Sequence, residues 1–69
     1  MTKAEICYCI ADYCAQYEID ITEAEIEVAA DALIDTVVEH EEYNYRCGIH
    51  GIDIDIILDH YFEEWEAEH

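Results

Sequence analysis

Apolar residues recur with helical spacing in three stretches of this chain, and acidic or polar residues fill most positions between them. Steps of three and four residues place an apolar set on one side of an α-helix, whereas a strand would require alternation. In the second stretch the set is Ile26, Ala30, Leu33 and Val37. In the third stretch it is Ile54, Ile57, Leu58, Tyr61, Phe62 and Trp65. Both stretches are therefore predicted to be amphipathic helices.

The first stretch has two apolar faces instead of one. The first face consists of Ile6, Ile10, Tyr13 and Tyr17. The second face lies nearly opposite and consists of Ala4, Tyr8, Ala11 and Ala15. Either this helix is sandwiched between other elements, or its outer face meets another chain.

Capping residues mark the helix starts. Thr2 with Glu5 and Thr22 with Glu25 form T-x-x-E capping boxes, in which hydroxyl and carboxylate satisfy free backbone N–H groups. Asp53 is a weaker start, because no glutamate follows three residues later. We predict helices near residues 3–18, 23–42 and 54–66, with connectors at 18–21 and 44–51.

These elements predict a single all-α domain over residues 1–69, a compact three-helix bundle. The chain has no proline and two glycines, which favours helices with few turns. Its 54% hydrophobic and 12% aromatic content distinguishes it from disordered acidic tails. With 69 residues, it is near the lower limit for one hydrophobic core.

The charge narrows the choice of partners. Nineteen Asp and Glu against two Lys and Arg give a formal net charge of −17. Nucleic acid and anionic membranes are polyanions, so this charge excludes both as direct partners and favours a basic protein. No apolar run approaches the roughly 20 residues of a membrane span, and no secretory signal is visible, so we expect a cytoplasmic protein.

An acidic residue recurs at every fourth position of the second helix, and no Lys or Arg lies among these positions in the sequence. Successive members are about 6 Å apart along a helix axis, on the scale of the spacing between nucleic-acid phosphates. Like charges at this spacing destabilise a helix slightly, so solubility alone does not require them. This acidic ladder is Glu23, Glu27, Asp31, Asp35 and Glu39.

A second acidic stripe is predicted on the outer side of the third helix, made of Asp55, Asp59, Glu63 and Glu66. Together with the ladder it would form a carboxylate surface that resembles the phosphates of a duplex. The tyrosines divide into two groups. Tyr13, Tyr17 and Tyr61 are expected in the core, whereas Tyr8, Tyr43 and Tyr45 are expected to be exposed, where Tyr43 and Tyr45 could anchor a contact.

No metal or other cofactor is predicted. Cys47 and His50 form a C-x-x-H pair, but two cysteines of the first helix cannot reach one zinc ion without breaking that helix. Cys7, Cys9 and Cys14 are therefore expected as free thiols, of which at most one could pair with Cys47. The sequence alone does not decide whether Cys47 and His50 bind a metal.

Catalysis is not expected. The chain has no serine, the Cys47 and His50 pair lacks a third partner, and a bundle of this size leaves little room for a cleft. We therefore predict that the protein is not an enzyme.

In its acid ladder, second stripe and compact size, the chain resembles small acidic inhibitors from phages and mobile elements that act against CRISPR or restriction machinery. Some of these present carboxylates in place of DNA phosphates. The resemblance implies a stoichiometric blocker that occupies the positively charged nucleic-acid-binding groove of a CRISPR effector or a restriction nuclease.

The alternative is a structural or regulatory interaction module that binds a basic partner, as an antitoxin does, or a homodimer. The dimer would form through Ala4, Tyr8, Ala11 and Ala15, because small residues permit close approach of two helices. The net charge of −17 opposes this self-association.

Overall fold

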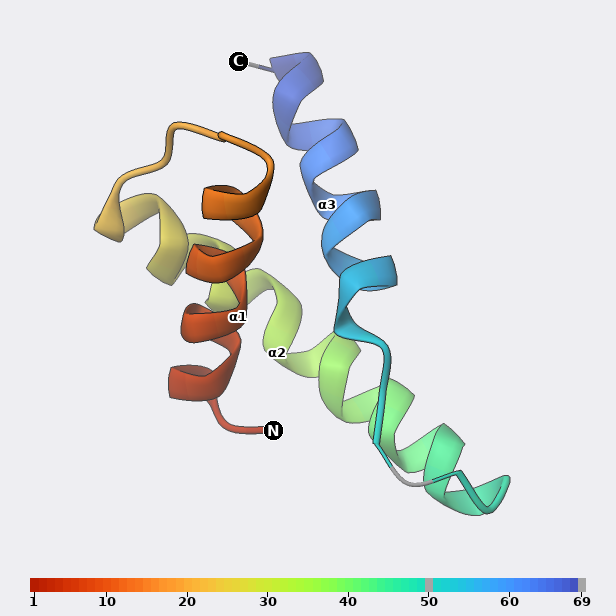
Figure 1. The fold of residues 1–69 in the computed structure, drawn as a ribbon. Helices are drawn as coiled ribbons and strands as arrows, with labels where there is room; N and C mark the ends of the chain where they lie inside the picture. Colours follow the sequence, from red (N-terminus) through yellow and green to blue (C-terminus); the bar gives the residue numbers. More distant parts are fainter. Residues whose placement is uncertain (50, 69) are drawn as a thin grey trace.

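The computed structural model describes residues 1–49 and 51–68, which form three α-helices. They are α1 (Lys3–Gln16), α2 (Glu23–Arg46) and α3 (Ile54–Glu68), shown in Figure 1. The prediction of an all-α three-helix bundle is confirmed. None of the described helices is both long and apolar enough to cross a membrane.

The long helix α2 sets the shape of the molecule. Its 24 residues span about 36 Å at 1.5 Å per residue, close to the longest dimension of 37 Å. Helix α1 packs against both α2 and α3. The first turns of α3 lie beside the middle of α2, and the two helices then diverge (Figure 1). The far end of α2 projects past α1 in the same view.

All three predicted caps are present. The Thr2 and Thr22 hydroxyls each accept a hydrogen bond of 3.2 Å from the backbone N–H three residues later. The Glu5 and Glu25 carboxylates accept from the Thr2 and Thr22 N–H groups at 3.0 and 3.2 Å, which completes both capping boxes. Asp53 accepts from the N–H of Asp55 at 3.2 Å and begins α3.

The predicted helix ends were less accurate. Helix α1 stops at Gln16, two residues early, because Glu18 adopts a left-handed conformation with φ of 55° and the Ile19 N–H turns back to the Cys14 carbonyl. Helix α2 continues four residues further, to Arg46, so Tyr43 and Asn44 are helical. Its end is set by Gly48, whose φ of 79° favours glycine. Helix α3 runs two residues beyond its predicted end.

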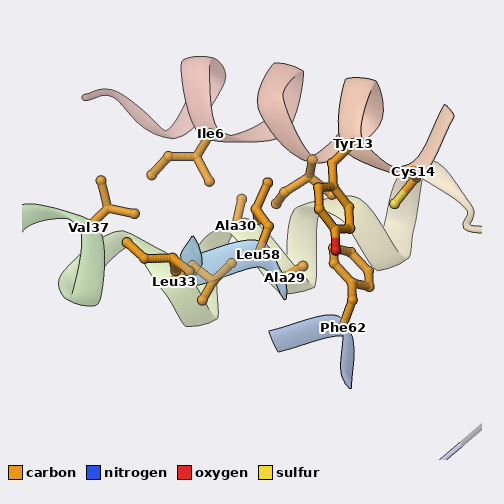
Figure 2. Close-up of a cluster of buried hydrophobic side chains, with 11 residues drawn as sticks. Ile6, Tyr13, Cys14, Ala29, Ala30, Leu33, Val37, Leu58 and Phe62 are labelled. Carbon is orange, nitrogen blue, oxygen red and sulfur yellow. The ribbon is translucent and has the colours of Figure 1, made fainter. Parts of the chain in front are cut away.

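The core lies between α1 on one side and α2 with α3 on the other (Figure 2). The predicted apolar sets of α2 and α3 supply most of it, and Ala29 and Cys14 are buried in addition. The largest fully buried side chains are Phe62, Ile6, Ile10, Leu58 and Val37.

For α1, one expectation was wrong and a choice between two alternatives is now decided. Tyr17, expected in the core, is 61% exposed and packs against the Tyr13 ring at a tilt of 43°, with ring centres 4.6 Å apart. It lies one turn beyond Tyr13, where the helix has ended. The face of Ala4, Tyr8, Ala11 and Ala15 is exposed, so α1 is not sandwiched.

Candidate partner-binding surface

The acidic ladder is exposed along its whole length on α2. It does not form a straight row. Four residues turn an α-helix by about 400°, so each member is displaced by about 40° around the axis from the one before. Over the five members, from Glu23 to Glu39, the ladder therefore curves around nearly half of the helix.

One position of the ladder is neutralised by a cation from another helix. The Lys3 ammonium on α1 lies 2.9 Å from a carboxylate oxygen of Asp31. The hydrogen bond to Asp31 raises the pKa of Lys3, and the charge of nearby Glu27 contributes. The pattern of α2 alone could not predict this ion pair, because Lys3 reaches Asp31 from another helix.

The stripe on α3 is exposed, as predicted, and it also borders α1. The Tyr13 hydroxyl donates a hydrogen bond of 2.5 Å to Asp59. Asp55 lies close enough to Cys9 that its charge, after burial and Asp12, helps to raise the pKa of that thiol. The helical-wheel prediction separated these acids from the core correctly, but it could not show that α1 lies beside them.

Beside this stripe is a hollow of about 260 Å³ where α1 meets α3. Its walls combine aromatic rings with carboxylates. The Tyr13 ring stacks on Phe62 with centres 5.4 Å apart, and Tyr17 leans on Tyr13. The lining residues are Tyr13, Tyr17, Ile19, Asp59, Phe62, Glu63 and Glu66.

The middle of the ladder and the α3 stripe consequently border different edges of α1, whereas the ladder residue Glu39 lies beside Tyr43 farther along α2. Lys3 marks the edge toward the α2 ladder, and Tyr13 with Cys9 marks the edge toward the α3 stripe. The exposed Tyr8, at 75%, lies on the outward face of α1 between those edges. The structure thus brings the middle of the ladder and the stripe together around one helix.

Tyr43 and Tyr45 do not join this surface. Both are exposed, at 67% and 73%, in the last turns of α2, which project past α1 (Figure 1). Tyr43 instead borders a shallow hollow together with Glu39 and His40.

The cysteines remain separate thiols, with Cys14 buried and Cys47 exposed. Burial raises the pKa of Cys14. In the described residues no three His, Cys, Asp or Glu side chains converge to hold a metal ion. His50, the second half of the C-x-x-H pair, lies outside the described residues.

Sequence reasoning missed a groove of about 300 Å³ between α2 and α3. Its detection required the relative placement of two helices, which periodicity does not give. The only sequence signal for this groove was His40. It lies four positions after Thr36 and three before Tyr43, so the three residues share one face of α2.

Comparison with known proteins finds no matching family model, no similar curated protein and no similar solved structure.

Proposed function

We propose that this protein is an acidic nucleic-acid mimic, a non-catalytic inhibitor that occupies the positively charged nucleic-acid-binding site of a partner such as a CRISPR effector or restriction nuclease. The observation that carries the proposal is the pair of exposed carboxylate rows on either side of α1. One of the two Lys and Arg side chains, Lys3, is already engaged by Asp31, so little positive charge offsets these rows.

The mechanism is electrostatic capture followed by steric exclusion. Lys and Arg in a nucleic-acid groove attract the carboxylates over about a Debye length, roughly 8 Å at physiological salt. Attraction of this kind accelerates association and weakens as salt rises. Once bound, the inhibitor competes directly with the polynucleotide for the same cations.

The hollow where α1 meets α3 supports this proposal, because it offers a specific binding site for a cationic side chain. A Lys or Arg side chain over the exposed Tyr17 ring would gain cation–π attraction, and Asp59, Glu63 and Glu66 would neutralise its charge. Such a contact would fix the orientation of the bound partner, which long-range attraction alone does not.

The test uses a variant in which binding and stability change in opposite directions. Glu27→Lys with Asp35→Lys replaces alternate ladder positions, on either side of Asp31, and creates favourable i,i+4 pairs on α2. We expect the fold to be retained or slightly stabilised, while inhibition of a target nuclease falls at least tenfold and its salt dependence weakens.

The matched control is Asp12→Lys with Asp20→Lys, which reverses the same number of charges at exposed positions outside both rows. This control should keep inhibition within about threefold. Equal loss in both variants would show that only net charge matters, and equal inhibition by the ladder variant would refute the mimic.

A homodimer or another interaction module is the second candidate, favoured by the exposure of the small-residue face around Tyr8. Light scattering at low and high salt distinguishes the two, because screening should promote a dimer that charge repulsion opposes. A monomer at both salt concentrations would remove the dimer.

A further inference from the structure

None of the residues of the two acidic rows lines the groove between α2 and α3, although the ladder residue Glu39 lines the hollow that continues it. Its apolar floor comes from Leu33, Ile57 and Tyr61, with Ile56 at its edge. Ile56 is 65% exposed and Leu33 is 7% exposed, so the groove descends from an accessible isoleucine to the core. In the part of the chain that the structure describes, only α2 and α3 line it.

The groove continues along α2. His40 lines it and also lines the neighbouring hollow of about 320 Å³ that Tyr43 borders. Leu33, Thr36, His40 and Tyr43 are three, four and three residues apart, so they follow one face of α2. From Leu33 to Tyr43, α2 rises about 15 Å, so a second helix of about ten residues lying alongside would match this length.

The charges at the rim indicate which kind of helix fits. Glu39 and Glu64 contribute carboxylates to the two hollows, and none of the described lining residues is Lys or Arg. His40 and His60 also line them, with His60 Nε2 3.8 Å from a Glu64 carboxylate oxygen, so the rim carries a positive charge only where a histidine is protonated. A second copy of this chain would bring another net charge of −17 to this acidic rim. A basic helix with one apolar face would instead place leucine-sized side chains on the floor and Lys or Arg beside the rim.

We propose that this groove docks a basic amphipathic helix of about ten residues from a partner protein. The proposal goes beyond nucleic-acid mimicry, because the apolar floor of the groove gives an affinity that depends on the pattern of the bound helix and not only on its charge. The partner's apolar side chains would contact Ile56, Ile57 and Tyr61, and its cations would face Glu39 and Glu64.

The experiment compares two fluorescein-labelled 14-residue peptides of identical Leu and Lys content, one with leucines at helical spacing and one scrambled. Because both peptides carry the same charge, the ratio of their affinities isolates the groove from general electrostatic attraction. At physiological salt we expect wild-type protein to bind the amphipathic peptide at least tenfold more tightly than the scrambled one.

Two variants locate the binding. Ile56→Asn should reduce the affinity ratio at least fivefold, whereas Val28→Asn should leave it within twofold. Val28 is a fair control because it is also 65% exposed and β-branched, and it lies on α2 outside the groove lining. Circular dichroism of both variants checks that their helix content is unchanged.

Two results would overturn the proposal: equal affinity for both peptides, or equal loss in both variants. Sedimentation of the protein alone provides a further check. A dimer that Ile56→Asn dissociates would assign the groove to a second copy and exclude the partner helix. None of these three results bears on competition with nucleic acid, so this inference and the proposed function can fail separately.

Discussion

Tyr13 on α1 donates a hydrogen bond of 2.5 Å from its hydroxyl to the carboxylate of Asp59 on α3, across 46 positions of the sequence. The same tyrosine ring stacks on Phe62, one turn further along α3. Because α3 diverges from α2, this polar and aromatic contact is a principal attachment of α3 to the rest of the fold.

Tyr13→Phe is expected to lower the free energy of unfolding by about 1.5 kcal/mol, the low end of the range for a hydrogen bond to a charged group, because Asp59 is exposed. The ring and its stacking on Phe62 are kept, so the change isolates the hydroxyl. Urea unfolding followed by circular dichroism measures it. Tyr17→Phe is the control, because the largely exposed Tyr17 should change stability by less than about 0.5 kcal/mol.

Alkaline pH should destabilise the fold. Burial, followed by the hydrogen bond to Asp59, raises the pKa of Tyr13, and burial raises the pKa of Cys14. A raised pKa means that the folded state holds its proton more tightly. This contribution is complete below the ordinary pKa values of about 8.5 for cysteine and 10 for tyrosine, and is lost as pH rises above them.

Unfolding free energies measured from pH 8 to pH 11 test this dependence. Above about pH 10 the free energy of unfolding should decline less steeply in Tyr13→Phe, because that variant lacks the Tyr13 hydroxyl, one of the groups whose deprotonation destabilises the fold. An identical decline in wild type and variant would assign the effect to other groups.

Thr22→Ala should destabilise the protein by about 1 kcal/mol, because it leaves the Glu25 N–H without its capping hydroxyl at the start of α2. Thr22→Ser keeps a hydroxyl at the same position and should be nearly neutral. Thermal unfolding of the two variants distinguishes loss of the cap from loss of the methyl group, and equal destabilisation would contradict a role for the hydroxyl.

Gly48→Ala should cost about 1 kcal/mol or more, because its φ of 79° lies in the left-handed region that side chains with a Cβ disfavour. The space around the position is open, with no atom within 4 Å of an added Cβ, so a loss of stability would come from the backbone alone. An unchanged melting temperature would show that α2 can end differently.

Local signals predicted the helix starts well. Capping at Thr2, Thr22 and Asp53 depends on residues three or fewer positions away, so the sequence contains the whole interaction. Helix ends depended on which residue adopts a left-handed conformation. Nothing in the residue type signalled this at Glu18, and the end of α1 was placed two residues late. Glycine is the usual signal at Gly48, yet the end of α2 was still placed four residues early.

Relations between helices could not be predicted from periodicity. The wheel of α2 showed an unbroken acidic ladder, yet Lys3 reaches Asp31 from α1. The wheel of α3 showed an outward stripe, yet Asp59 hydrogen-bonds to Tyr13. In both cases a helix wheel gives the angle of a side chain around its own axis, but not the position of the neighbouring helix.

The displacement of about 40° per step along the acidic ladder gives its carboxylates a right-handed sense, with a full revolution after about 54 Å. The strands of B-DNA also wind right-handed, but with a pitch of about 34 Å. A straight, narrow cationic cleft could therefore meet only a few consecutive carboxylates at once. A target that engages all five members, from Glu23 to Glu39, would need a binding channel that follows a gentler spiral than the duplex does.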